Sequence, residues 1–211
     1  MKQFIIIASC SLPLLLAGCG TAPIKPYQAA SSSTSERTAQ ASGVEVALDP
    51  FVESSRTKEY FDVDAVANGL AILHVRVVNT TSNQTYLVEK KNFQLLRNGA
   101  EDLAGDGKRT EGSNTGANVI AWGGLVVYGA LTPAAMLTSM SMISRATEVQ
   151  RNFTAKEMGD QTLSPGQSME GFLYFTPVKK GEDWSRVAVV QANLMSTKDH
   201  QVIELRIPLS Q

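Results

Sequence analysis

From residue 43 to the C-terminus, apolar residues occur in short runs of strand length, and turn-forming residues separate these runs. The runs over 70–78 (LAILHVRVV) and 202–207 alternate so that an extended chain would have an apolar face. Turn-forming residues occur at 79–83 (NTTSN) and at Asn98-Gly99. Because helices do not alternate with these runs, antiparallel pairing is favoured over a parallel sheet. The pattern predicts a mainly β chain that folds as an antiparallel β-sandwich.

About eight short strands are expected from this pattern. The first is expected to end at Asp49-Pro50, and no repeat of fixed period connects the strands. The expected strands cover residues 44–48, 60–63, 70–78, 86–89, 93–96, 169–175, 187–194 and 202–207.

The first residues, MKQFIIIASCSLPLLLAGC, carry a positive charge at Lys2, an apolar core over 4–16 and the tetrapeptide LAGC at 16–19. The core is too short for an ordinary membrane span. This arrangement resembles the lipobox signal peptide of bacterial lipoproteins, in which small residues give a peptidase access to the bond before the cysteine. The resemblance implies that residues 1–18 are a lipoprotein signal peptide and that Cys19 is the lipidation site.

Lipidation at Cys19 has consequences for location and for cysteine chemistry. Each buried methylene of an acyl chain contributes about 0.8 kcal/mol, so several chains anchor a protein stably. Cys10 would leave with the signal peptide, and Cys19 would then be the only cysteine, so no intrachain disulfide is expected. The residue after the cysteine is Gly20 and not Asp. By the enterobacterial sorting rule this favours the outer membrane, with the chain facing the periplasm.

Residues 20–42 are rich in Ser, Thr and Ala and hold little that could form a core. We expect 19–42 to comprise the lipidated cysteine and a flexible tether with an end-to-end distance of about 25 Å. A domain edge that packs in places is the alternative interpretation. The folded domain is expected to cover residues 43–211.

The block LSPGQSMEGFLYF at 163–175 joins a turn to an apolar, aromatic strand. It resembles the late segment of immunoglobulin-like domains in bacterial extracytoplasmic lipoproteins, where a Leu-x-Pro-Gly turn precedes a glycine and such a strand. The resemblance implies an immunoglobulin-like β-sandwich and no particular activity, because function depends on sites placed on a fold. The Cys…Trp…Cys pattern of antibody domains is absent from the sequence.

No charged residue occurs between residues 112 and 144. Thr132-Pro133 predicts the start of a helix, and Gly159 predicts its end. Helical spacing predicts one buried stripe on this helix, formed by Ala135, Ser139, Met142, Ala146, Val149 and Phe153. The second half of this helix also carries charged residues that can face water. We therefore expect a helical insertion at 112–159, with an apolar helical region over about 117–158.

Three interpretations of residues 117–143 remain open. The segment could be a transmembrane helix, a hairpin packed on the sandwich, or an exposed surface for a partner, a second copy of the chain or a lipid interface. Glycines, a proline and many Ser and Thr residues weaken the transmembrane interpretation. The residues expected to contact a partner are Trp122, Leu125, Val126, Tyr128, Met136 and Met140.

Side chains able to do chemistry are few. The chain has only two histidines, His74 and His200, whereas a zinc site needs three or four ligands. Asp62 and Asp64 would share one side of the strand expected at 60–63, where paired carboxylates could serve acid–base chemistry or bind calcium. A solvated strand face is the simpler interpretation. We therefore expect no catalytic residue, no metal and no cofactor.

These patterns predict a membrane-anchored envelope lipoprotein that acts as a non-catalytic binding or assembly module. Two alternatives remain, a periplasmic hydrolase using Asp62, Asp64 or His74, and a passive structural envelope lipoprotein. The expected partners are the membrane, through Cys19, and an envelope protein or a second copy, through 117–143. Nucleic acid is not expected, because 19 basic and 20 acidic residues give a formal net charge of −1.

Overall fold

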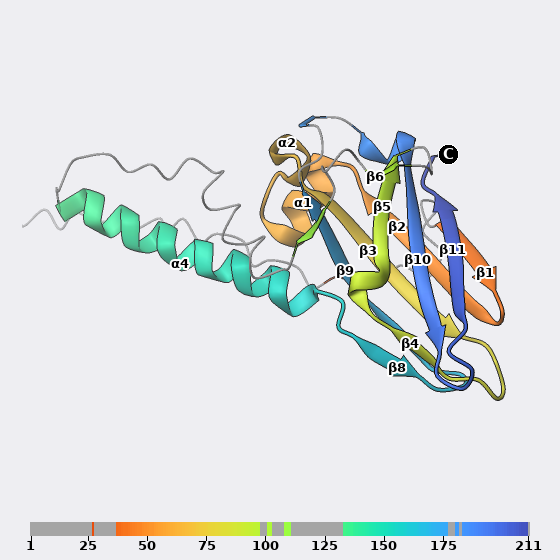
Figure 1. Ribbon diagram of the computed structural model, residues 1–211. Coiled ribbons are helices and arrows are strands. Elements are labelled where there is room, and N and C mark those ends of the chain that lie inside the picture. The colour runs from red at the N-terminus through yellow and green to blue at the C-terminus, as the bar shows by residue number, and fades with distance from the viewer. Residues whose placement is uncertain are drawn as a thin grey trace, which may run out of the picture.

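The computed structural model describes Tyr27 and most of the chain from residue 37 onward. The described ranges after Tyr27 are 37–97, 101–102, 108–110, 133–176, 180–181 and 183–210. For 101–102, 108–110, 133–143 and 176 only the backbone is described. The described chain is mainly β and forms two antiparallel sheets with few helices (Figure 1).

The first sheet has the strand order β1-β2-β3-β9-β7, and every neighbouring pair in it is antiparallel. Its central strand, β3, is the apolar run that the sequence marks most clearly, and the pairing of Leu73 with Leu173 sets its register on β9. The strands are β1 (Arg37–Ala41), β2 (Val44–Phe51), β3 (Ala71–Asn79), β9 (Ser168–Thr176) and β7 (Lys108–Thr110).

The second sheet is built around β10, which pairs along its length with β11. β5 pairs with the first half of β10 and β4 with its end, and the 3-10 turn η1 (Lys90–Asn92) joins β4 to β5. The strands are β4 (Tyr86–Val88), β5 (Phe93–Arg97), β6 (Glu101–Asp102), β8 (Gln161–Leu163), β10 (Ala188–Ser196) and β11 (Val202–Pro208).

One apolar core lies between the two sheets. Alternate residues of β10, such as Val190 and Leu194, are fully buried, and their neighbours in the strand are only half-buried. The predicted apolar face of the last strand is buried at Leu205, Ile207 and Leu209. The alternation read from the sequence is therefore confirmed for this sheet.

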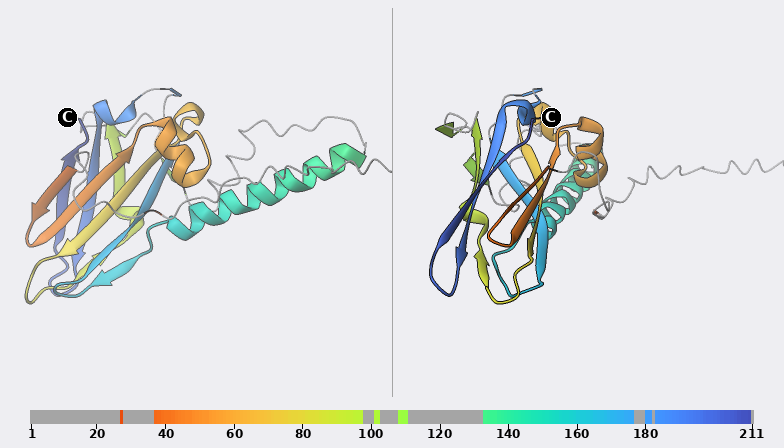
Figure 2. Two further views of the ribbon diagram at one scale, coloured as in Figure 1. Left: turned by 180° about the vertical axis from the view of Figure 1, so that it is seen from behind. Right: turned by 90° about the vertical axis from the view of Figure 1, so that its right-hand side faces the viewer.

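The helices lie on the outer face of the first sheet. α1 (Ser54–Phe61) and α2 (Ala65–Asn68) connect β2 to β3, and α4 (Pro133–Lys156) precedes β8. The right-hand view of Figure 2 shows the two sheets from the side, with the helices beyond the first sheet. A 3-10 turn, η2 (Trp184–Val187), leads into β10. The second sheet covers one face of β3 and the helices lie over the other, so side chains on both faces of β3 are buried.

α4 extends well beyond the sheets, and only its C-terminal part meets them (Figure 1). The helix expected inside the 112–159 insertion is thus confirmed, with bounds Pro133–Lys156. Residues 111–132 lie outside the described residues. No helix among the described residues is long and apolar enough to cross a membrane.

The strand expected at 60–63 is wrong, because Tyr60 and Phe61 form the end of α1. Thr57 and Phe61 are one helical turn apart, and both are fully buried. The buried positions of this segment therefore follow the spacing of a helix and not the alternation of a strand. Asp62 then ends the helix in the left-handed conformation, with φ of 60°.

The boundary expected at residue 42 is also wrong, because Arg37–Ala41 forms β1 and pairs with β2. Ala39 and Ala41 pack against the core between the sheets, while Thr38 and Gln40 are exposed. Tyr27 packs on the domain as well. Ser- and Thr-rich composition marked this segment as a tether, but a strand at the end of a sheet needs only one apolar face.

Candidate functional site

A second apolar cluster lies on the outer face of the first sheet, beneath α1, α2 and the C-terminal part of α4. Its rings pack in tilted and edge-to-face pairs with centroid distances between 4.8 and 6.1 Å, which is favourable geometry for aromatic side chains. We call it the outer aromatic cluster. Its buried members are Phe51, Phe61, Val63, Ala65, Leu70, Ile72, Val149, Phe153, Phe172 and Tyr174, with Tyr27 and Tyr60 packed against them.

Phe153 holds the base of α4 in this cluster. Its side chain is fully buried, and its ring lies 4.8 Å from the ring of Phe61 and 5.0 Å from that of Tyr174. The Tyr174 hydroxyl donates a hydrogen bond of 2.9 Å to the Phe153 carbonyl oxygen. Val149, one turn earlier, is also buried. This confirms the C-terminal end of the apolar stripe that helical spacing predicted.

Polar contacts add to this attachment. The Asn152 side-chain amide donates to the Tyr60 carbonyl oxygen at 2.9 Å, and the Lys156 ammonium donates to the same oxygen. The Lys156 ammonium also lies 4.8 Å from the centre of the Phe61 ring, a cation–π distance. Burial lowers the pKa of Lys156 to about 8. α1 and the base of α4 are therefore joined by both ring packing and hydrogen bonds.

The chain that follows α4 is also attached to the two sheets. The Met158 amide donates to the Phe172 carbonyl oxygen at 2.9 Å, and Met158 is buried in the core between the sheets. The Lys90 ammonium lies 3.0 Å from a carboxylate oxygen of Glu157, which ties this segment to η1. The base of α4 is thus connected to both sheets.

Tyr27 occupies a socket of four rings at the edge of the outer aromatic cluster. Its ring centroid lies 4.4 Å from that of His74 and 4.9 Å from that of Phe172. Phe51 and Tyr60 are at 5.8 and 5.6 Å. The socket therefore combines rings from β2, β3, β9 and α1.

A buried charged pair lies next to this socket. Asp49 is 2% exposed, and its carboxylate accepts both hydrogen bonds of the Arg56 guanidinium, one of them 2.8 Å long. The Tyr27 hydroxyl donates to Asp49 at 3.2 Å. The guanidinium also lies 3.8 Å from the centre of the Phe51 ring. Burial and the nearby Asp49 charge raise the pKa of Tyr27, so its hydroxyl remains protonated and can donate.

His74 is buried between the rings of Tyr27 and Phe172. The pKa of His74 is lowered to about 4, mainly by burial, while Asp49 acts to raise it and the positive charges of Arg56 and Arg76 act to lower it. Its Nε2 atom lies 3.9 Å from a Glu170 carboxylate oxygen. The side chain is neutral at pH 7 and enclosed by rings, an arrangement suited to packing.

Asp62 and Asp64 do not form the carboxylate pair expected from the sequence. The Asp62 carboxylate accepts from the Arg145 guanidinium of α4, whereas Asp64 caps α2 by accepting from the Ala67 amide at 3.0 Å. Asp64 also accepts from the Ser54 hydroxyl at 2.7 Å, and these hydrogen bonds lower its pKa. Within the described residues, no group of three or more His, Cys, Asp or Glu side chains could hold a metal ion.

The residues expected to contact a partner fall largely outside the described part of the chain. Trp122, Leu125, Val126 and Tyr128 lie in 111–132, and Cys19 also lies outside the described residues. Met136 and Met140 belong to α4, of which only the backbone is described at these positions. Their contacts therefore stay a prediction.

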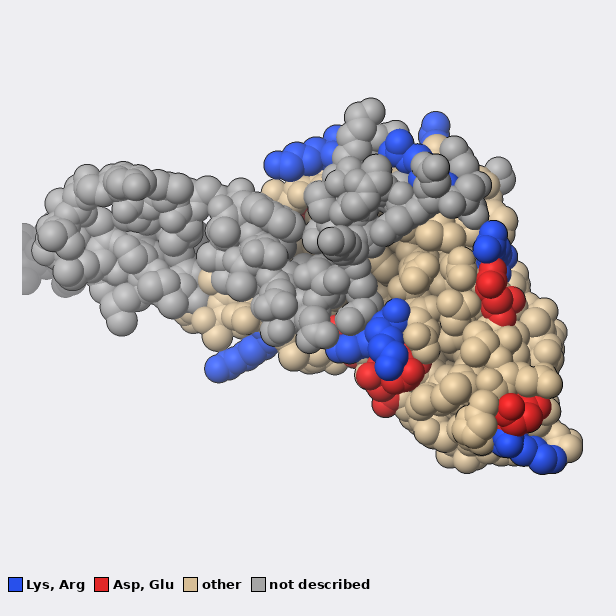
Figure 3. Space-filling model, viewed as in Figure 1, with Lys and Arg blue, Asp and Glu red and all other residues tan. Residues whose placement is uncertain are grey.

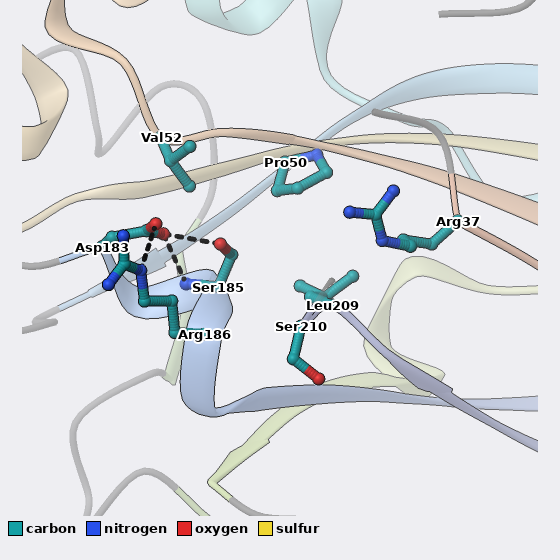
Figure 4. A pocket seen from close by; sticks show the side chains of 8 residues that line it. All are labelled: Arg37, Pro50, Val52, Asp183, Ser185, Arg186, Leu209 and Ser210. Atoms are coloured by element: carbon teal, nitrogen blue, oxygen red, sulfur yellow. Dashed lines mark hydrogen bonds and ion pairs between the residues drawn. The ribbon is translucent and has the colours of Figure 1, made fainter. Parts of the chain in front are cut away.

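A separate hollow lies where the edges of the two sheets meet (Figure 4). Its volume is about 510 Å³. Asp183 accepts from the Ser185 hydroxyl at 2.5 Å and from the Arg186 guanidinium at 3.2 Å, so these polar groups satisfy one another. The lining residues are Arg37, Pro50, Val52, Asp183, Ser185, Arg186, Leu209 and Ser210.

The face of the second sheet differs from the helix-covered face. In Figure 3 most of the visible described surface is uncharged, and charged side chains are few and scattered. Along β10 the outward residues include Gln191 and Asn193, which are half-buried. Val202 on β11 is 62% exposed. This face offers single apolar side chains, whereas the helix-covered face carries the aromatic cluster.

Comparisons with other proteins leave the function to be argued from the residues. No family model matches the chain, and no curated protein matches it in sequence. Among solved structures, the chain is similar to the crystal structure of a FixG-related protein from Vibrio parahaemolyticus. The two chains are 10% identical, the match covers 79% of this chain and 94% of that chain, and the TM-score is 0.33. A likeness this weak carries no argument.

Sequence reasoning missed Tyr27 and the Asp49–Arg56 pair. One signal for Tyr27 was present, because it is the only aromatic residue between positions 20 and 42. The pairing of Asp49 with Arg56 had no such signal, since it depends on how α1 folds back on the end of β2.

Proposed function

We propose that this protein is a membrane-anchored envelope lipoprotein whose domain is a non-catalytic binding or assembly module. In this proposal Cys19 carries the lipid, and α4 with the preceding uncharged stretch presents the partner surface. The observation that carries the proposal is the attachment of α4. Its base is fixed by Phe153 in the outer aromatic cluster, and its first part extends beyond the sheets (Figure 1).

We also propose that the domain is immunoglobulin-like. Constant-type immunoglobulin domains place strands A, B, E and D in one sheet and C, F and G in the other. Here β2-β3-β9-β7 are neighbours in one sheet, and β5-β10-β11 are neighbours in the other. Taken in chain order, these strands correspond to A through G. In this correspondence α4 belongs to the connection between D and E.

The sequence of α4 supports a binding role for its projecting part. Residues 112–144 hold no charge, whereas the part of α4 that lies against the sheets carries Arg145, Glu148 and Arg151. An uncharged helix start on a firmly held base suits contact with an apolar segment of another envelope protein. The roles of His74, Asp62 and Asp64 in packing, ion pairing and capping give no support to a hydrolase.

The lipid anchor is tested by metabolic labelling with a palmitate analogue in a bacterial host. We expect label on the full chain and on Cys10→Ser, and none on Cys19→Ser. Cys10→Ser is the matched control because it removes the other cysteine of the chain. Equal labelling of the Cys19→Ser chain would refute the anchor.

The assembly role is tested by charged substitutions in the uncharged stretch. We expect Val126→Asp and Met140→Glu to abolish cross-linked envelope complexes that contain the chain, while the amount of protein and its melting temperature stay unchanged. Val202→Asp is the matched control, because it places the same charge on an exposed valine of β11. Intact complexes in folded Val126→Asp and Met140→Glu proteins would refute this role.

A further inference from the structure

Tyr27 attaches the N-terminal segment to one particular face of the domain. Its ring lies within 6 Å of rings on β2, β3, β9 and α1, and its hydroxyl donates to the buried Asp49 carboxylate. This is the face that α1, α2 and the base of α4 cover. A flexible tether would make none of these contacts.

The position of Tyr27 limits how far Cys19 can lie from this face. Eight residue steps separate Cys19 from Tyr27, and a fully extended chain of this length spans at most about 29 Å. If the chain were free up to Arg37, where β1 begins, eighteen steps would allow about 65 Å. Docking of Tyr27 therefore cuts the reach of the tether by more than half.

We propose that Tyr27 is a clamp that turns the helix-covered face of the domain toward the membrane. This inference rests on the proposed lipidation of Cys19, which would place the lipid within reach of α1. The occupant of this face is then the membrane surface to which the chain is anchored. The face of the second sheet, including Val202, points away from the membrane.

The orientation also specifies the class of partner. Phe172 contacts Tyr27 directly and also contacts Phe61, whose ring packs against Phe153 at the base of α4. The clamp and the base of α4 thus share one cluster, and α4 leaves the domain from the membrane-facing side. The partner of its uncharged first part is accordingly a protein held at or in the same membrane.

The clamp is tested with a nitroxide spin label on Cys19 of the full chain carrying Cys10→Ser, in detergent micelles. We expect the label to broaden the amide signals of Lys58 and Glu59 on α1 and to leave those of Val202 and Glu204 on β11 sharp. Tyr27→Ala should remove this difference while the β10 amide signals keep their positions. Tyr27→Phe should preserve it, because the ring contacts remain.

Equal broadening of α1 and β11 in the parent chain would overturn the inference, and so would a difference that survives Tyr27→Ala. Because the spin label replaces the lipid, this result does not depend on lipidation in the cell. Loss of the clamp with normal palmitate labelling refutes the inference and leaves the anchor intact. An intact clamp without palmitate labelling refutes the anchor, and the membrane orientation fails with it.

Discussion

A Cβ atom on Gly171 would lie 2.5 Å from the Cα atom of Met158. Gly171 is in the middle of β9, and Met158 follows α4, so the absence of a side chain lets the chain after the helix lie directly against the strand. There Glu157 forms an isolated parallel bridge with Phe172, and the Met158 amide donates to the Phe172 carbonyl oxygen. Only glycine fits where two backbones approach each other this closely.

Gly171→Ala is therefore expected to destabilise the protein by about 3 kcal/mol, because the methyl group meets backbone that cannot move cheaply. Gly159→Ala is the matched control, since a Cβ there meets no atom within 4 Å. The control should change the free energy of unfolding by less than about 0.5 kcal/mol. Urea denaturation followed by circular dichroism measures both, and equal stabilities of the two variants would contradict the close approach.

Phe153→Ala should cost about 3–5 kcal/mol, because it removes a fully buried ring that packs on Phe61 and Tyr174. Thr154→Ala, at the adjacent exposed position of α4, should cost less than about 0.5 kcal/mol. The comparison is made by urea denaturation of the two variants. A small effect at Phe153 would show that α4 is not held by the cluster.

The strand faces could be predicted because alternation directly encodes burial in a two-layer fold. Leu205 and Ile207 are buried as the pattern of the last strand predicts, and β3 matches the run over 70–78 within one residue at either end. The turn over 79–83 is also confirmed. There the Asn79 side-chain oxygen accepts from the Thr81 amide at 3.0 Å, a local bond that the residue types themselves favour.

The outer aromatic cluster could not be predicted, because its parts are distant in sequence. Phe61 looked like a strand residue in the run 60–63, yet tertiary contacts with Phe153 and Phe172 stabilise it in a helix. Tyr27 looked like part of a tether because its neighbours are small and polar. Its burial depends on a socket built from four other elements, which a local pattern does not reveal.

The residues of the candidate site also divide into those whose burial the sequence predicted and those whose role it did not. Helix spacing predicted that Val149 and Phe153 are buried, since both positions depend only on the period of α4. The expectation that Asp62 and Asp64 share a face failed together with the strand on which it depended. Asp64 instead takes the N-cap position of α2, a role that aspartate often has before a short helix.

The Asp49–Arg56 pair should contribute to stability much more than a surface pair. Arg56→Ala leaves a buried carboxylate without its guanidinium partner, and we expect a loss of about 2–3 kcal/mol, since Arg56 itself is partly exposed. Arg206→Ala, which breaks the exposed pair with Glu204, should cost less than about 0.5 kcal/mol. Adding Asp49→Asn to Arg56→Ala should recover part of the loss, and additive effects in this double-mutant cycle would contradict the coupling.

His74 should make the protein less stable as the pH falls from 6.5 to 4. Its pKa is lowered from 6.5 to about 4 in the folded state, mainly by burial. Between these values the unfolded chain binds a proton that the folded chain does not bind. The free energy of unfolding contributed by His74 therefore falls with decreasing pH, by about 3 kcal/mol in total, and is constant above and below this window.

The charged groups near His74 affect its protonation in opposite directions. Asp49 and Glu170 favour the protonated form, whereas Arg56 and Arg76 oppose it. His74→Phe keeps a ring in the cluster and removes the titration, so its stability should depend less on pH between 4 and 6.5 than that of the parent chain. His200→Gln, at an exposed turn position, is the matched control for the loss of one histidine. Urea denaturation at a series of pH values measures the difference. Parallel curves for His74→Phe and the parent would show that the buried histidine is not the source of the pH dependence.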